Sequence, residues 1–406
     1  MTEIEVTLTI PTYGGEAMGR LADGRAVFVA FGLPGETVRA RLTEEKRGFA
    51  RAVLLEVLTP SSQRITPRCV HFGICGGCHY QMLSYPQQVE LKQIVLRDQL
   101  SRIGKIQNPP VREMVQSPAE WNYRNHMQFH LTRDGRPGFI AAGDPQAVVS
   151  ITECHLPEAP LNTLWPQLQF DADTPLERVS LRAGDETMLI LESDSPQPPE
   201  LEIEAELSVV HTHAEDSIVL AGEPAIFIEI LGRSFQVSAE AFFQVNTRMA
   251  EKMVAYLLNR LRVTTSNLLL DIYCGVGLFS AFFAPKVRQV IGIEISPAAC
   301  EDFAANLHEF DNVELYEALA EDVLPQLSLR PDVAIVDPPR AGLDKKALDA
   351  ILKLAPKTLA YVSCDPSTLA RDAARLIAGG YTLLEVTPFD LFPQTYHIES
   401  ISIFER

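Results

Sequence analysis

Short apolar runs separated by turns fill the first 59 residues of the chain. Residues 4–10 alternate apolar and polar positions, 26–30 form a compact apolar run, and 52–58 supply a further run. Glycine-containing turns separate these runs, at Gly14–Gly15, Asp23–Gly24 and Leu33-Pro34-Gly35. Several short strands within sixty residues are typical of a small β-barrel, which we predict for residues 1–59.

A helical pattern follows between Pro86 and Gly104, two residues that suit the start and the end of a helix. Its apolar stripe consists of Val89, Ile94, Val95, Leu96, Leu100 and Ile103. From about Val111 to Phe235 the pattern favours strands separated by polar turns. Residues 60–235 are therefore predicted to form a small α+β central domain, whose helix 86–104 is expected to pack on the C-terminal domain.

From residue 236 onward the pattern predicts helices that alternate with buried strands. A helix is predicted over 239–262. The predicted strands are 268–271, 289–294, 332–337, 358–363, 381–387 and 398–404. This order predicts an α/β Rossmann-like domain over 236–406, with a doubly wound sheet whose ligands bind at the carboxyl ends of the strands.

Length and composition are those of an ordinary soluble protein of two or three domains, with 406 residues and 46% hydrophobic residues. No run of about 18 apolar residues is present, so a transmembrane helix and a membrane partner are not expected. The N-terminus lacks the basic and apolar regions of a signal peptide. A cytoplasmic location is therefore predicted, and it disfavours disulfides.

The net charge of −18 argues against a nucleic-acid partner until its distribution is considered. Residues 171–230 hold 15 acidic and 2 basic residues, a net charge of −13, so the rest of the chain nets only −5. Residues 60–133 hold 9 basic and 4 acidic residues, a net charge of +5. This basic stretch is either a phosphate-binding face or a solvated basic helix, and charge alone does not separate the two.

Three cysteines fall within ten residues, as Cys69, Cys75 and Cys78 with the spacing C-x5-C-x2-C. Thiolates this close can bind a soft metal or a cluster, form disulfides, or take part in redox chemistry. Gly76 and Gly77 between the last two would let the backbone fold tightly around a ligand.

A candidate cofactor loop follows the first buried strand of the α/β domain. It contains Tyr273 and Gly275 and ends at Gly277, but Ser280 prevents a match to G-x-G-x-x-G. Glu294 ends the second strand, where an acid can accept both hydroxyls of a ribose, although a helix-capping role is the alternative. Without a pyrophosphate loop, an adenosine with a non-phosphate tail fits better than NAD, which suggests S-adenosylmethionine.

Candidate catalytic groups end the later strands of the same sheet. Asp337 begins the sequence Asp-Pro-Pro-Arg, which ends at Arg340, and Cys364 precedes a predicted helix start. A helix N-terminus is expected to lower the pKa of such a thiol and favour a nucleophilic thiolate, whereas a lone cysteine after a strand is more often a small buried hydrophobe. His397 and Glu399 are expected to share one strand face, where Glu399 could act as a general base or be a merely solvent-facing acid.

Taken together, the chain resembles the RNA uracil-5-methyltransferase family over essentially its whole length. Residues 1–59 resemble the family's TRAM domain, an OB-like RNA-binding barrel, through Gly14–Arg20, Val27–Val29 and Leu33–Glu36. The resemblance implies a multidomain fold of this barrel, a central iron–sulfur domain and a class I methyltransferase domain. The three cysteines match the family's iron–sulfur motif, and Cys154 matches the fourth ligand, which implies a 4Fe-4S cluster.

The resemblance also assigns roles to single residues. Cys364 matches the family's nucleophile and Glu399 its base, and Arg340 is a candidate for contacting the substrate. The implied S-adenosylmethionine contacts are Gln244, within Ala241–Asn246, and Tyr273, Gly275, Glu294 and Asp337. Leu278 departs from the asparagine that many members have after the second glycine, and Ala318 is the nearest candidate for a missing asparagine near the adenine. Cys274 would be a cofactor-loop residue and Cys300 a core residue.

The implied function is methylation of carbon 5 of a uridine in RNA by a monomeric enzyme. The four-cysteine set favours the chiefly ribosomal branch and thus 23S rRNA, with tRNA as the alternative, and the acidic segment 171–230 is expected to face away from the RNA. A radical methylthiotransferase would need C-x3-C-x2-C, and a non-catalytic RNA-binding protein would not need both Cys364 and Glu399. Zinc suits four thiolates as well as a cluster does and stays open.

Overall fold

The computed structural model describes residues 2–172, 174–200, 206–214 and 216–406. The predicted N-terminal barrel is confirmed, since the first five strands form a closed barrel with the order β1-β2-β3-β5-β4. Its strands are β1 (Glu3–Pro11), β2 (Glu16–Arg20), β3 (Ala26–Ala30), β4 (Thr37–Glu45) and β5 (Phe49–Thr59). Alternate apolar residues such as Leu8, Val27 and Val38 fill the interior, because successive side chains of a strand point to opposite faces.

The predicted helix after the cysteine loop is α1 (Tyr85–Arg102), which begins with a capping box between Ser84 and Gln87. It packs on α8 (Pro366–Ala378) of the C-terminal domain, in the same apolar core. Two members of the predicted stripe, Ile94 and Ile103, are exposed instead. Two polar residues of α1, Gln88 and Lys92, are fully buried instead. They lie on the face of α1 that packs against a polar loop near the C-terminus.

The central domain is built on a seven-stranded sheet of order β12-β11-β10-β9-β6-β7-β8. Its elements are β6 (His126–Leu131), β7 (Pro137–Ala141), β8 (Asp144–Ser150), α2 (Ala159–Leu164), the 3-10 helix η1 (Trp165–Gln167), β9 (Leu176–Ala183), β10 (Thr187–Ser193), β11 (Ser208–His213) and β12 (Asp216–Ala221). The acidic segment 171–230 runs through β9–β12 and on to the end of β13 (Ala225–Ile230), and its residues 173, 201–205 and 215 lie outside the described residues.

A hairpin of β13 (Ala225–Ile230) and β14 (Arg233–Ser238) leads into the C-terminal domain and shares its apolar core. The helix predicted over 239–262 is shorter, because α3 spans Thr247–Arg260. Asn246 caps it by accepting a hydrogen bond from the Met249 N–H at 3.3 Å. Residues 239–246 instead form turns ahead of the helix, so the prediction was wrong at its start.

The C-terminal sheet has the order β17-β16-β15-β18-β19-β21-β20, parallel from β17 to β19 and antiparallel at β21. Its strands are β15 (Leu268–Ile272), β16 (Gln289–Glu294), β17 (Val313–Glu317), β18 (Val333–Val336), β19 (Thr358–Ser363), β20 (Thr382–Phe389) and β21 (Glu399–Glu405). The remaining helices are α4 (Leu278–Phe283), η2 (Ala284–Lys286), α5 (Pro297–Leu307), α6 (Ala320–Val323), η3 (Leu324–Gln326) and α7 (Lys345–Leu354). The predicted α/β architecture is confirmed, and no helix among the described residues is long and apolar enough to cross a membrane.

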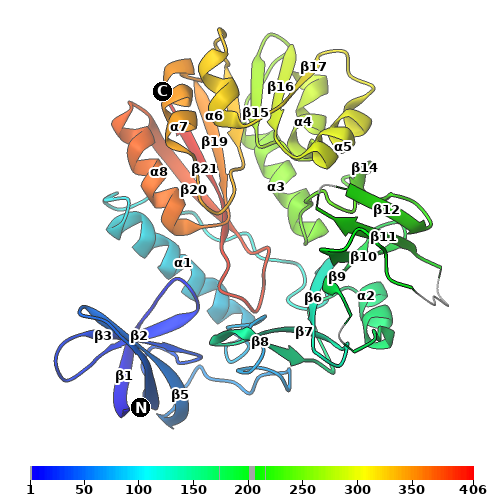
Figure 1. The fold of residues 1–406 in the computed structure, drawn as a ribbon. Helices are drawn as coiled ribbons and strands as arrows, with labels where there is room; N and C mark the ends of the chain where they lie inside the picture. The colour runs from blue at the N-terminus through cyan, green and yellow to red at the C-terminus, as the bar shows by residue number, and fades with distance from the viewer. Residues whose placement is uncertain (1, 173, 201–205, 215) are drawn as a thin grey trace.

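The segment between β20 and β21, residues 390–398, leaves the C-terminal sheet and descends toward the barrel and the central sheet (Figure 1, red). We call it the base loop, because it leads to Glu399, the candidate general base. Its Tyr396 contacts Tyr13 of the barrel and His79 of the cysteine-containing segment.

Candidate functional site

The loop after β15 has the backbone geometry that a bound small molecule requires. Tyr273, Gly275 and Gly277 all have positive φ, at 63°, 53° and 87°. A Cβ added at Gly277 would lie 2.4 Å from Leu307 Cδ1, so glycine is needed there, whereas open space surrounds Gly275. The loop therefore leaves its backbone at Gly275 accessible to a ligand.

Glu294 ties this loop to the end of β16. One carboxylate oxygen accepts the Gly275 N–H at 3.0 Å, and the other accepts the N–H groups of Ile295 and Ser296 at 2.8 and 2.9 Å. Ser296, and not Glu294, is the N-cap of α5, so Glu294 has a structural role in the turn before this helix. Its Oε1 already accepts two hydrogen bonds, whereas Oε2 accepts one and keeps a lone pair for a ribose hydroxyl.

Three acids gather at the ends of β15, β16 and β18. Burial raises the pKa of Asp271 to about 6, and its Oδ2 accepts a hydrogen bond from Ser280 Oγ at 2.6 Å. Burial, followed by the charges of Asp271 and Glu294, raises the pKa of Asp337 to about 7. Near neutral pH the carboxyl group of Asp337 therefore holds a proton part of the time.

Cys364 and Glu399 lie across from each other at the ends of two antiparallel strands. Ser363 of β19 is paired with Ser400 of the antiparallel β21, so Cys364, one residue after Ser363, lies opposite Glu399, one residue before Ser400. Glu399 is 4% exposed. Burial, followed by the charge of Asp337, raises the pKa of Glu399 well above its ordinary value, while Arg340 opposes the shift.

The expected lowering of the Cys364 pKa is wrong for the protein without its ligands. Burial, followed by the charges of Glu399 and Asp337, raises the pKa of Cys364 to about 12. Asp365, the N-cap of α8, adds a further negative charge beside the thiol, while Arg340 lowers the pKa. These effects outweigh the helix N-terminus, so the resting side chain is a thiol.

His397 does not share a strand face with Glu399, because β21 begins only at Glu399. Its Nδ1 lies 3.2 Å from Arg340 Nη2, and its ring packs against those of Tyr396 and Phe392. Burial, followed by the charge of Arg340, lowers the pKa of His397 to about 3. The imidazole is therefore neutral in the folded protein.

The base loop is fixed by polar groups that the sequence interpretation missed. Lys92 Nζ of α1 donates to Asp390 Oδ1 at 2.7 Å and to the Phe392 carbonyl at 3.0 Å, and both charged side chains are fully buried. Gln88 and Gln394 exchange two hydrogen bonds of 2.9 Å, from Gln88 Nε2 to Gln394 Oε1 and from Gln394 N to Gln88 Oε1. From the sequence, a glutamine and a lysine four residues apart on a helix are predicted to lie on the same face of the helix. Nothing in that spacing predicts that the face is buried.

Gln244 lies just before α3 and is 8% exposed. Its carbonyl accepts a hydrogen bond from Asn125 Nδ2 at 3.0 Å, which ties this segment to the central domain. The side chain is thus held on a rigid segment next to the C-terminal sheet.

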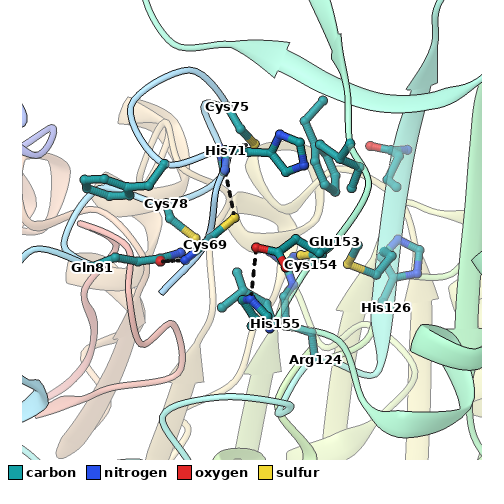
Figure 2. Close-up of a pocket in the computed structure, with 17 residues that line it drawn as sticks. Cys69, His71, Cys75, Cys78, Gln81, Arg124, His126, Glu153, Cys154 and His155 are labelled. Carbon is teal, nitrogen blue, oxygen red and sulfur yellow. Dashed lines mark hydrogen bonds and ion pairs between the residues drawn. The ribbon is translucent and has the colours of Figure 1, made fainter. Parts of the chain in front are cut away.

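The four cysteines line one cavity of about 300 Å³ in the central domain. Figure 2 shows Cys69, Cys75, Cys78 and Cys154 around this space. The N–H groups of His71 and Gly77 donate to the sulfurs of Cys69 and Cys75, both at 3.4 Å. All four thiols are free, and burial raises the pKa of Cys78 to about 12 and that of Cys154 to about 11.

This donor set suits a soft metal or a cluster, since four sulfurs surround one space and N–H groups point at two of them. Among the described residues, the four cysteine side chains are not close enough together to form a preorganised metal site. Metal binding removes the protons from cysteine ligands and draws them into their final positions. The cavity therefore fits either a metal ion or a cluster, and it does not distinguish between the two.

Comparison with known proteins agrees with this architecture. The family model described as tRNA (Uracil-5-)-methyltransferase matches residues 225–406, and the TRAM domain model matches residues 2–55. An uncharacterized RNA methyltransferase of Thermosynechococcus vestitus is 36% identical over 98% of this chain and 97% of its own length. Another, from Synechocystis, is 34% identical over 99% and 95% of the two chains.

Among solved structures, the Pyrococcus abyssi tRNA (uracil-54, C5)-methyltransferase in complex with S-adenosyl-L-homocysteine has a similar fold. The two superpose with a TM-score of 0.75 over 99% of this chain and 100% of that one, at 23% sequence identity. At this identity the likeness concerns the fold.

Proposed function

Because this chain belongs to the RNA (uracil-5-)-methyltransferase family and is an S-adenosylmethionine-dependent RNA methyltransferase with a TRAM domain, we propose that it methylates carbon 5 of a uridine in 23S rRNA. The observation that carries the proposal is the placement of Cys364, just after the carboxyl end of β19, opposite buried Glu399 at the amino end of β21. The reaction needs a nucleophile that adds to carbon 6 and a base that removes the proton from carbon 5. A thiol and a carboxyl group in this arrangement fit these two roles.

Carbon 5 of uracil is a weak nucleophile and needs activation. The sulfur of Cys364 adds to carbon 6, which makes carbon 5 an enolate carbon able to attack an electrophilic methyl group. S-adenosylmethionine supplies that methyl group when bound. Glu399 then removes the proton from carbon 5, and the sulfur leaves as the double bond forms again.

Because the pKa values of Cys364 and Glu399 are both raised, each group must lose a proton to solvent before it acts, Cys364 as the nucleophile and Glu399 as the acceptor of the carbon 5 proton. Arg340 is the cation that lowers the pKa of both Cys364 and Glu399. We assign to it the stabilisation of negative charge on this pair, and contact with the substrate. The target base must be unstacked from the RNA to reach Cys364 between the strand ends.

The residues proposed to hold S-adenosylmethionine surround the loop after β15. Gly275 offers an open backbone, and Oε2 of Glu294 keeps a lone pair for a ribose hydroxyl. The other proposed contacts are Gln244, Tyr273 and Asp337. Isothermal titration with S-adenosylmethionine should show binding that weakens by about tenfold or more in Glu294→Gln, because a charged hydrogen-bond acceptor for the ribose is lost.

Four cysteines would hold the proposed 4Fe-4S cluster: Cys69, Cys75, Cys78 and Cys154. The cluster would serve the fold of the central domain, and the catalytic steps above do not involve it. Protein purified without oxygen should show a visible charge-transfer absorption, with iron and sulfide in equal amounts. Stoichiometric zinc without iron would refute the cluster.

Transfer of labelled methyl groups to unmodified 23S rRNA and tRNA, followed by mapping of the modified nucleotide, tests the substrate. Label in a single uridine of 23S rRNA is expected, because the four-cysteine set and the barrel resemble the ribosomal branch. Label in tRNA alone would replace the proposed substrate with the alternative one, the class named for the solved Pyrococcus abyssi enzyme. Cys364→Ala should transfer no label, and RNA containing 5-fluorouridine should trap the wild type covalently.

A further inference from the structure

Tyr13 reaches from the barrel into the catalytic site. It lies in the turn between β1 and β2, and its phenol donates a hydrogen bond to Asp365 Oδ2 at 3.1 Å. Its ring meets that of Tyr396 edge-on, with 5.6 Å between the ring centroids. Since Asp365 follows Cys364 directly and Tyr396 precedes Glu399 by three residues, one barrel side chain contacts both segments that carry the reacting pair.

On the nucleophile side, the Tyr13 contact completes the fixation of Asp365. Oδ1 of Asp365 accepts the N–H groups of Ser367 and Thr368, at 2.8 and 3.1 Å, and so caps α8. Its backbone N–H donates to Ser363 Oγ at 3.2 Å. With Oδ2 held by Tyr13, the residues on both sides of Cys364 are fixed. Burial and the charge of Asp365 raise the pKa of the Tyr13 phenol, which keeps its proton on the oxygen for this bond.

On the base side, Tyr396 packs among three rings. Its centroid lies 4.6 Å from that of His79 and 4.3 Å from that of His397, in addition to the contact with Tyr13. The base loop is bent here, since Gln394 has a φ of +71° and its carbonyl accepts the N–H groups of His79 and Tyr80 at 2.8 and 3.0 Å. The loop thus takes its shape from residues that lie far upstream in the chain.

Close packing also fixes the barrel turn itself. A Cβ added at Gly15 would lie 3.0 Å from His79 Cβ, and the φ of Gly15 is +83°. The turn therefore rests directly against the residue that supports the base loop. Its contact with the site depends on backbone placement as well as on one flexible side chain.

We propose that Tyr13 is a positioning residue for methyl transfer, which keeps Cys364 aligned with Glu399 by joining Asp365 to Tyr396. The proposal rests on the proposed function in that Cys364 and Glu399 are taken as the reacting pair. Small displacements of reacting groups reduce rates strongly, so loss of this contact should affect turnover more than RNA binding. A role of Tyr13 in binding RNA would give the opposite pattern.

Tyr13→Phe keeps the ring contact and removes the hydrogen bond. We expect kcat to fall about tenfold and the KM for RNA to stay within about twofold. The matched control is Tyr381→Phe, which removes the buried hydrogen bond from Tyr381 to the Pro356 carbonyl at 2.8 Å, at the opposite end of the C-terminal sheet. That variant should keep the wild-type kcat. A raised KM with unchanged kcat in Tyr13→Phe would overturn the proposal.

A double-mutant cycle tests whether Tyr13 acts through Asp365. The loss of kcat in Tyr13→Phe/Asp365→Asn should equal that in Asp365→Asn alone, because both changes disrupt the same contact. Fully additive losses would show that Tyr13 acts independently of Asp365, against the proposal.

The rate of Cys364 alkylation by iodoacetamide supplies a measurement that does not depend on the RNA substrate. It should change by about twofold or more in Tyr13→Phe and stay constant in Tyr381→Phe, since only the first variant alters the surroundings of the thiol. An unchanged rate in Tyr13→Phe overturns the positioning role. Absence of methyl transfer by the wild type, with a changed alkylation rate in Tyr13→Phe, would instead count against the proposed function alone.

Discussion

Arg340 donates a hydrogen bond to His397 across the catalytic site, from Nη2 to Nδ1 at 3.2 Å. Because a guanidinium only donates, Nδ1 of His397 must accept, and its proton is on Nε2. The same cation lowers the pKa of Cys364 and that of Glu399, the two groups of the proposed reacting pair. Arg340 thus both favours the ionised forms of Cys364 and Glu399 and determines the tautomer of His397.

Replacing Arg340 by Gln should slow alkylation of Cys364 in the protein without RNA. Loss of the cation raises the thiol pKa further above about 12, so less thiolate exists at any given pH. We expect a rate about threefold or more below that of the wild type at pH 8, measured by iodoacetamide labelling and mass spectrometry. Arg136→Gln removes an exposed arginine of the central domain and serves as the control. Equal rates in Arg340→Gln and wild type would contradict this role.

Replacing Glu399 by Gln should stop the reaction after methyl transfer. Without a base to remove the carbon 5 proton, the methylated RNA should stay joined to Cys364, and turnover should fall about 100-fold or more. A labelled protein–RNA complex on a denaturing gel measures this. Glu405→Gln, at the exposed end of the same strand, should turn over normally. Free methylated RNA formed at the wild-type rate by Glu399→Gln would assign the base to another residue.

Replacing Lys92 by Met should destabilise the protein by about 3–5 kcal/mol, since Asp390 would be left as a buried charge without its cation. Denaturant unfolding measures the loss. The double variant Lys92→Met/Asp390→Asn should recover much of it, because the uncompensated charge is gone. Arg102→Met, which breaks an exposed pair with Asp98, should cost about 1 kcal/mol or less. A similar loss in both single variants would show that the buried pair contributes no more than a surface pair.

Acidification should destabilise the protein partly through His397. Its folded-state pKa is lowered to about 3, whereas the unfolded chain takes up the proton near about 6.5, so stability is lost as the pH falls from about 6.5 to about 3. Glu399 and Asp337, with raised pKa values, act in the opposite direction. Between pH 7 and pH 5, His397→Asn should therefore lose up to about 2 kcal/mol less unfolding free energy than the wild type. Equal losses in denaturant titrations at the two pH values would exclude this contribution.

The sequence predicted the parts of the site that depend on local order along the chain. Strand ends followed by acids or by a cysteine located Asp337 and Cys364 at one edge of the sheet, because parallel strands align their carboxyl ends. The start of α3 was predicted too early, since the cap at Asn246 competes with the helical pattern before it. His397 was placed on a strand that begins two residues later.

Contacts over long sequence distances were beyond the sequence pattern. Lys92 and Asp390 are 298 positions apart, and Tyr13 and Asp365 are 352 positions apart, so neither pairing has a local signal. The pKa of Cys364 was predicted wrongly for the same reason, since it depends on residues far away in the sequence. Its helix N-terminus is visible in the sequence, but the burial and the carboxylates that raise its pKa depend on the folded arrangement of three strands.

The anchoring of the base loop by α1 has a consequence for how this enzyme can be divided. Residues 225–406 match the family model as a unit, yet the loop that leads to Glu399 is held by Gln88 and Lys92 of the upstream chain. A fragment cut at the start of the match would leave Asp390 unneutralised and Gln394 without its partner. The methyltransferase domain therefore cannot be transferred on its own. A chimaera that joins it to a different RNA-binding domain must also include α1.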